Sequence, residues 1–179
     1  MLALIFLVTT IMTLYIKILL LHIWMQLVQC DGYNSFTQLI MSITRPVVSP
    51  FQRVFKYHGT CDVVSLLIAY MISVLMVPIM LKLVSFDAIL FYLGLVILLK
   101  ALGVLIFWVI IGRSLTSWMS QGSNSVDEIL LQLTEPFMIP IRRLIPPTGD
   151  LDFSVMIVIG ILYLLNFIGL EYIPGWANF

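Results

Sequence analysis

The side chains of this chain that could do chemistry are a few cations set in or beside long apolar segments. Lys17 and Lys100 lie inside such segments, and no Asp or Glu stands at a similar depth. This pattern predicts an intramembrane polar site at Lys17 and Lys100, either an anion pathway or two lysines that extend toward the membrane surface. The missing carboxylates argue against coupled proton or sodium transport. His22 and Arg113 are closer to segment ends, where we expect them at the membrane interface.

Further cations belong to an element that occurs twice. It consists of a threonine, two prolines four residues apart and an arginine, followed by a glycine and an aspartate at the same spacing in both copies. The first copy holds Thr44, Pro46, Pro50, Arg53, Gly59 and Asp62, and the second holds Thr134, Pro136, Pro140, Arg143, Gly149 and Asp152. Such agreement indicates a duplicated structure rather than shared hydrophobicity.

The repeated element predicts a surface for a partner or for lipid. Guanidinium groups at Arg53, Arg142 and Arg143 could bind lipid phosphates or the carboxylates of another protein. The prolines should end the preceding helix in each copy and create a fixed bend, because proline removes a donor and restricts the residue before it. Asp62 and Asp152 have two interpretations: each caps the next helix, or each pairs with the arginine of its own copy.

Composition limits the class of protein. Hydrophobic residues make up 61% of the chain and charged residues 10%, against roughly half and a quarter in soluble domains. Nine cationic and nine anionic side chains cancel, so no basic field attracts nucleic acid. The spacing of Cys30 and Cys61 suits neither a zinc site nor a disulfide scaffold. Phosphate loops, nucleophile elbows and zinc-protease motifs are absent, so we expect no enzyme, no cofactor and no bound metal.

Long apolar segments predict an all-α membrane protein with about four transmembrane helices. A bilayer core of about 30 Å requires about 20 helical residues. Four segments qualify, at residues 2–28, 63–84, 88–119 and 154–172. The third exceeds one crossing, so it either tilts strongly or contains a separate piece at 88–99.

Residues within these segments predict how the helices pack. Small side chains recur every four positions at Ser65, Ala69 and Ser73, and again at Gly112, Thr116 and Ser120, so helices can approach closely there. Tyr70, Tyr163 and Asn166 could form hydrogen bonds between helices. Trp24, Trp118 and Trp176 fall near segment ends, as in an aromatic belt.

The duplication divides the chain into two parallel helix–amphipathic loop–helix repeats, residues 1–86 and 87–179. Two spans in each repeat bring both loops, residues 30–62 and 120–153, to the same side of the membrane. Cations gather there and at the adjacent helix end, at Arg45, Arg53, Lys56, Arg113, Arg142 and Arg143, whereas the opposite side has Lys82. The positive-inside rule therefore predicts that loops 29–62 and 120–153 are cytoplasmic.

Each loop has the periodicity of an amphipathic helix. Apolar residues at positions i, i+3, i+4 and i+7 are Phe36, Leu39, Ile40 and Ile43 in the first loop and Val126, Ile129, Leu130 and Leu133 in the second. Asn34 or Ser35 can cap the first helix, and Ser125 with Glu128 can form a capping box on the second. Such helices lie on or dip into the membrane interface.

These motifs together resemble the YggT family, also called YlmG, over nearly the whole chain. The resemblance is carried by Trp24-Met25-Gln26, by Cys30-Asp31-Gly32-Tyr33-Asn34, and by the paired Thr-x-Pro-x-x-x-Pro-x-x-Arg and Gly-x-x-Asp elements. It implies a location in the bacterial inner membrane and links to osmotic tolerance, to cell division and to assembly of membrane complexes. The chain departs from the family pattern at Lys56, where a proline is typical, and at His22, where an arginine is typical.

Two functions remain open at this point. The favoured one is a non-catalytic scaffold or assembly factor that uses the proline-containing loops to bind anionic lipids and other membrane proteins. The alternative is a small channel or transporter, which would need a homo-oligomer because four helices leave little room for a pore.

Overall fold

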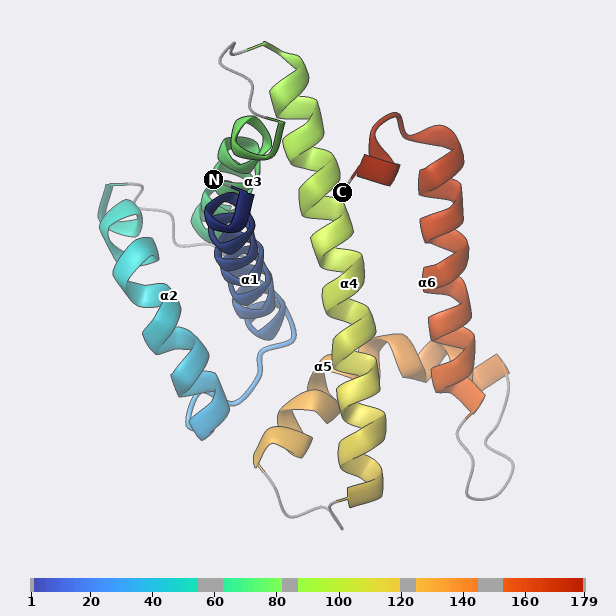
Figure 1. Ribbon diagram of the computed structural model, residues 1–179. Helices are drawn as coiled ribbons and strands as arrows, with labels where there is room; N and C mark the ends of the chain where they lie inside the picture. Colours follow the sequence, from blue (N-terminus) through green and yellow to red (C-terminus); the bar gives the residue numbers. More distant parts are fainter. Residues whose placement is uncertain (1, 55–62, 82–86, 120–124, 145–152, 179) are drawn as a thin grey trace.

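The computed structural model describes residues 2–54, 63–81, 87–119, 125–144 and 153–178. Within those ranges the chain forms six α-helices, one short 3-10 turn and no strand (Figure 1). The helices are α1 (Leu2–Leu27), α2 (Ser35–Val54), α3 (Val63–Leu81), α4 (Ile89–Met119), α5 (Ser125–Leu144) and α6 (Phe153–Tyr172), followed by the turn η1 (Trp176–Asn178). The predicted all-α class is therefore confirmed.

Four of the helices are long and apolar enough to cross a membrane. They span Leu2–Leu27, Val63–Leu81, Ile89–Thr116 and Ser154–Tyr172, in close agreement with the predicted segments. The third is one continuous helix of 31 residues, about 46 Å long at ~1.5 Å per residue. The alternative of a separate piece at 88–99 is therefore wrong, and α4 must tilt or extend beyond the hydrocarbon.

The main core lies where α1, α3 and α4 pack together. Lipid tails are as apolar as leucine, so burial of apolar surface does not by itself drive these helices together, and close packing must hold them. Ser65, Ala69 and Ser73 of α3 are each fully buried, as their spacing predicts. At the contact with α4, a Cβ built on Gly94 would lie 2.9 Å from the Cα of Val74. The backbones of α3 and α4 therefore meet too closely for a side chain at position 94.

The last helix stands at the edge of this bundle (Figure 1). Most residues of α6 are exposed, and its span has a smaller buried share than those of α3 and α4. It contacts α4 and α5, with a small second core formed by Ile110, Met138 and Val158. A loosely packed α6 leaves room beside α4, where a groove lies between the two helices.

The helices of the two loops run through their prolines, contrary to the prediction that the Thr-x-Pro step ends them. Pro46 and Pro50 lie inside α2, and Pro136 and Pro140 lie inside α5. All four are exposed, so water can bond to the carbonyls that the prolines leave without a donor. The chain therefore keeps its helix through both elements, and α5 curves across the lower end of the bundle (Figure 1).

The repeated threonines support these helices from the buried side. Thr44 Oγ1 donates to the carbonyl oxygens of Ile40 at 3.0 Å and Met41 at 3.3 Å. Thr134 Oγ1 makes the same bonds one repeat later, to Leu130 at 2.8 Å and Leu131 at 3.2 Å. Both hydroxyls thus bind the turn before the proline, which is how threonine stabilises or bends a helix at such a position.

Candidate functional site

The first candidate site is the face that α2 and α5 expose. The buried side of α2 contains Thr37, Ile40, Thr44 and Val48. The corresponding side of α5 contains Asp127, Ile129, Leu133, Thr134 and Met138. The predicted apolar stripe is therefore buried more completely in α5 than in α2, where Leu39 and Ile43 are exposed. The prolines occupy the opposite face of each helix.

The arginines of this face are placed only in part. Arg142 and Arg143 are exposed in the last turn of α5, where cations interact favourably with the helix dipole. Arg53 belongs to the last turn of α2, and its side chain lies outside the described residues. Asp62 and Asp152 also lie outside them, so both interpretations of these aspartates remain predictions.

A hydrogen bond joins the two loop helices at their beginnings. Asn34 caps α2 as predicted, because its Oδ1 accepts from the amide of Phe36 at 3.0 Å. The Nδ2 of the same side chain donates to the carbonyl oxygen of Ser125, the first residue of α5, at 2.7 Å. Asn34 therefore caps α2 of the first repeat and bonds to α5 of the second, which places the beginnings of the two helices side by side.

An aromatic contact also joins the repeats. The rings of Trp24 on α1 and Phe137 on α5 meet edge to face, with centroids 5.6 Å apart. Trp24 is buried, so the expected role in an aromatic belt is wrong for this residue. Together with the bond from Asn34, this contact fixes α5 against the first half of the chain.

A partly buried ion pair, which sequence reasoning missed, holds α5 against α4. Arg113 Nη1 and Asp127 Oδ1 are 2.9 Å apart, with side chains 22% and 11% exposed. Thr116 Oγ1 donates to the same carboxylate oxygen at 2.8 Å. Arg113 is thus a structural partner rather than a free surface anchor. Its signal in the sequence was an acidic residue in the first turn of an amphipathic helix that closely follows an arginine-containing span.

The first repeat lacks this ion pair, because Ile23 and Thr37 stand 90 residues before Arg113 and Asp127. Thr37 occupies the position of Asp127 and is buried, and no described residue bonds to its hydroxyl. His22 on α1 is 8% exposed, and one of its ring nitrogens lies 3.2 Å from Gln26 Nε2. His22 therefore packs within the fold. The two repeats share a shape but differ in charge at this place.

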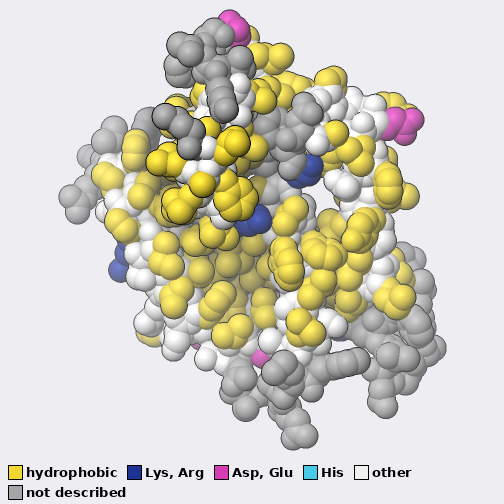
Figure 2. Space-filling view, in the orientation of Figure 1, with side chains coloured by type: hydrophobic (Ala, Val, Ile, Leu, Met, Phe, Trp, Pro, Cys, Tyr) yellow, Lys and Arg dark blue, Asp and Glu magenta, His cyan; other side chains and the backbone are white. Residues whose placement is uncertain are grey.

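The second candidate site is a groove between α4 and α6. It has a volume of about 600 Å³, within the ~300–1,000 Å³ typical of small-molecule sites. Its walls are almost entirely apolar and include Leu99, Gly103 and Phe107 of α4 and Leu162 and Leu165 of α6. Figure 2 shows it as an opening between α4 and α6, with Lys or Arg atoms at its margin and hydrophobic side chains around it.

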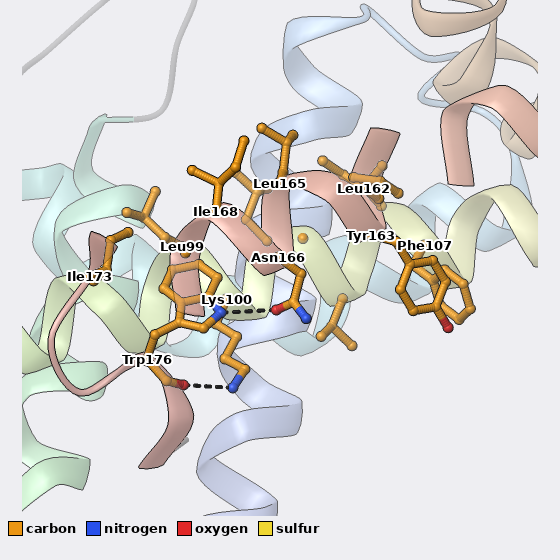
Figure 3. Close-up of a pocket in the computed structure, with 15 residues that line it drawn as sticks. Leu99, Lys100, Phe107, Leu162, Tyr163, Leu165, Asn166, Ile168, Ile173 and Trp176 are labelled. Atoms are coloured by element: carbon orange, nitrogen blue, oxygen red, sulfur yellow. Dashed lines mark hydrogen bonds between the residues drawn. The ribbon is translucent and has the colours of Figure 1, made fainter. Parts of the chain in front are cut away.

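Lys100 places a positive charge in this groove. Its Nζ donates to the carbonyl oxygen of Trp176 at 2.9 Å and lies 5.8 Å from the centre of the Trp176 ring (Figure 3). Trp176 Nε1 in turn donates to Asn166 Oδ1 of α6 at 2.9 Å. The turn after α6 thus folds back, and Trp176 bridges the two helices.

Close packing fixes the same turn. A Cβ on Gly169 would lie 2.6 Å from the Trp176 ring, so the indole rests directly on the α6 backbone. Gly175 has a φ of 87°, which favours glycine, and Tyr92 Oη donates to the Pro174 carbonyl at 3.2 Å. The bridge over the groove is therefore rigidly held.

Lys17 and Lys100 do not form a common site. Lys17 is partly buried on α1 and does not line the groove, so the predicted pathway lined by both lysines gains no support. Of the remaining polar predictions, Tyr70 does bond between helices, donating to the Phe91 carbonyl at 3.0 Å. Within the described ranges, no three His, Cys, Asp or Glu side chains come together as a metal site would require.

Cys30, at the corner between α1 and α2, offers a test by chemical labelling. It is a free thiol, and burial raises its pKa above the ordinary value of about 8.5. Only the thiolate reacts with maleimide, so between pH 7 and 8 we expect slow labelling that accelerates about tenfold per pH unit. Labelling of a Cys61→Ala variant in its native membrane at several pH values measures this. A rate that levels off near pH 8 would contradict a raised pKa.

Comparison with known proteins is consistent with this geometry. The CCB3/YggT family model matches residues 1–83 and 92–173, one match in each repeat. The "Uncharacterized protein YggT" of Escherichia coli K12 is 42% identical over 173 residues, covering 97% of this chain and 92% of that protein. An "Uncharacterized protein in proC 3'region" of Vibrio alginolyticus is 40% identical over 179 residues, covering 97% and 90%. An "Uncharacterized protein" of Haemophilus influenzae is 34% identical over 166 residues, covering 93% and 91%. No solved structure matches the chain. With both repeats matched and near full-length relatives at this identity, the chain belongs to the CCB3/YggT family.

Proposed function

We propose that this protein is a non-catalytic scaffold or assembly factor of the bacterial inner membrane. In this proposal α2 and α5 lie on the cytoplasmic side, and their exposed proline face binds another membrane protein and anionic lipid. Roles in osmotic tolerance, cell division or assembly of membrane complexes, which the family resemblance implies, would follow from the partner that is bound.

The observation that carries the proposal is that α2 and α5 each expose a proline-containing face. The bond from Asn34 to Ser125 links the beginnings of the two helices at 2.7 Å, and the prolines of both repeats are exposed. A helix that exposes prolines has fewer conformations to lose on binding. Arg142 and Arg143 at the end of α5 add the charge that phosphate or carboxylate groups would recognise. The same cations support the cytoplasmic orientation through the positive-inside rule.

The alternative is a small oligomeric channel or transporter, which would use Lys17 and Lys100. It is less favoured because the two lysines do not line one groove. A pore would have to form between copies of the chain.

The scaffold proposal predicts a cross-link that depends on the arginines. A photoreactive amino acid at Ile139, which is 43% exposed on α5, should capture one defined protein in native membranes. Changing both Arg142 and Arg143 to Ala should weaken that contact about thirtyfold, since each cation near an anionic surface contributes about 1 kcal/mol. The yield of the cross-linked band, identified by mass spectrometry, measures the loss.

Two controls separate the scaffold from the channel. Arg45→Ala removes an exposed arginine of α2. The corresponding position of the second repeat is Glu135, so the two repeats do not share a cation here, and the cross-link should persist. Vesicles reconstituted with the protein should remain impermeable to ions. An ion flux that changes in Lys17→Ala or Lys100→Ala would refute the scaffold and support the channel.

A further inference from the structure

Lys100 is an unusual cation because its position on α4 keeps it away from both membrane surfaces. Arg113 follows it by 13 residues on the same helix, which corresponds to about 20 Å. A hydrocarbon core of about 30 Å is wider than that separation, so the two charges cannot both lie at its boundaries. Arg113 is paired with Asp127 of α5, and because the proposed function places α5 at the membrane surface, Arg113 is assigned to one boundary. Lys100 then lies about 10 Å inside the opposite one.

The direction of the side chain brings the charge toward that opposite surface. Side chains on a helix point toward its N-terminus, so Lys100 extends away from Arg113 and toward the end where α4 begins. The groove opens along the same stretch of α4, from Leu99 to Phe107. The ammonium group of Lys100 thus lies at one end of the apolar groove, which extends deeper into the bilayer.

The charge of Lys100 is not neutralised by any described carboxylate. Its Nζ donates to the neutral carbonyl of Trp176 at 2.9 Å, and this bond uses one of the three N–H donors of an ammonium group. A lysine in an apolar wall favours an anion nearby, because the cost of holding a charge there falls when it is paired. The anion must also carry an apolar part that fits between α4 and α6.

We propose that this groove binds one anionic phospholipid. Its phosphate group accepts from Lys100 beside the Trp176 bridge, and one acyl chain lies along Gly103 and Phe107 between α4 and α6. The lipid comes from the leaflet on the side where α4 begins, opposite to α2 and α5. The site is therefore separate from the α2–α5 surface and goes beyond the scaffold proposal.

Gly103 allows the acyl-chain part of the site to be tested without disturbing the fold. It lines the groove, and a Cβ added to it would meet nothing within 4 Å. Gly103→Leu should therefore fill the groove while leaving the helix packing intact. Gly160→Leu is the matched control, because Gly160 of α6 also has open space around it and does not line the groove.

The experiment is native mass spectrometry of the purified, delipidated protein with equal amounts of phosphatidylglycerol and phosphatidylcholine that have identical oleoyl chains. The unaltered protein should retain phosphatidylglycerol in preference to phosphatidylcholine. Lys100→Gln should lower that preference about fivefold, the effect of one cation near an anionic headgroup, and Lys100→Arg should keep it. Lys17→Gln removes a lysine outside the groove and should leave the preference unchanged. Gly103→Leu should reduce retention of both lipids, whereas Gly160→Leu should not.

Three results would overturn the proposal. The first is equal retention of the two lipids by the unaltered protein. The second is a preference for phosphatidylglycerol that survives Lys100→Gln. The third is a preference that disappears only when Arg142 and Arg143 are changed, which would place the lipid on the α2–α5 side. The cross-link at Ile139 should be unaffected by Lys100→Gln, so failure of this proposal is distinguishable from failure of the scaffold.

Discussion

Replacing Asp127 by Ala should lower the free energy of unfolding by about 3 kcal/mol, the low end of the range for breaking a buried ion pair. The change leaves the guanidinium of Arg113 without the carboxylate 2.9 Å away and removes the acceptor that Thr116 has at 2.8 Å, so that its hydroxyl keeps the Arg113 carbonyl at 3.1 Å. We place the loss at the low end because the Arg113 side chain is 22% exposed and can reach water. Thermal or denaturant unfolding in detergent, compared with the unaltered protein, measures it.

A double-mutant cycle distinguishes the ion pair from simple loss of packing. If the cost comes from an unpaired charge, Arg113→Leu combined with Asp127→Leu should be more stable than either single variant, since removing both charges leaves no uncompensated one. Glu135→Ala is the control, because Glu135 is an exposed carboxylate of the same helix and should change stability by less than about 0.5 kcal/mol. Additive single effects would show that Arg113 and Asp127 contribute independently.

Gly94→Leu should be at least as damaging, because it separates α3 from α4. A Cβ at this position would lie 2.5 Å from Val74 Cγ2, 2.9 Å from Val74 Cα and 3.0 Å from Val74 N. Overpacking typically costs about 1–3 kcal/mol, and here part of the clash is with backbone, which cannot rotate away. We expect a cost of about 3 kcal/mol or more, visible as loss of folded, monodisperse protein and a lower unfolding temperature.

Trimming the neighbour should not repair this variant. Val74→Ala removes the side-chain clash but leaves the contacts with Val74 Cα and N, so Gly94→Ala with Val74→Ala should remain destabilised relative to Val74→Ala alone. Gly103→Leu, on the same helix and in open space, should stay folded. Recovery in the Gly94→Ala and Val74→Ala double variant would mean that the helices can shift apart at little cost.

The helical spans and their packing face followed from local rules. Hydropathy located the four spans because every backbone polar group in lipid must bond within its own helix. The four-residue spacing of Ser65, Ala69 and Ser73 located the buried face of α3. Asn34 was recognisable as a helix cap from its type and place. These predictions needed only neighbours along the chain.

The prolines show where a local rule failed. Proline usually interrupts a helix in water because the freed carbonyl and the ring clash are costly. In α2 and α5 the prolines are exposed and Thr44 and Thr134 bond to the preceding turn, so the helix continues. Whether a proline ends a helix thus depended on which side of the helix it occupies once the bundle has formed.

The candidate site residues also divide into those that local sequence patterns identify and those that only the folded structure brings together. The sequence by itself determined an all-helical membrane protein built as two repeats, and it identified Lys100, the paired prolines and the arginines, because these depend on composition and spacing. Only the tertiary structure decided that Arg113 pairs with Asp127, that Asn34 holds Ser125, and that Trp176 returns to Lys100 across 76 residues. Each of these contacts joins different helices, and their meeting depends on helix directions and crossing positions that no local pattern encodes.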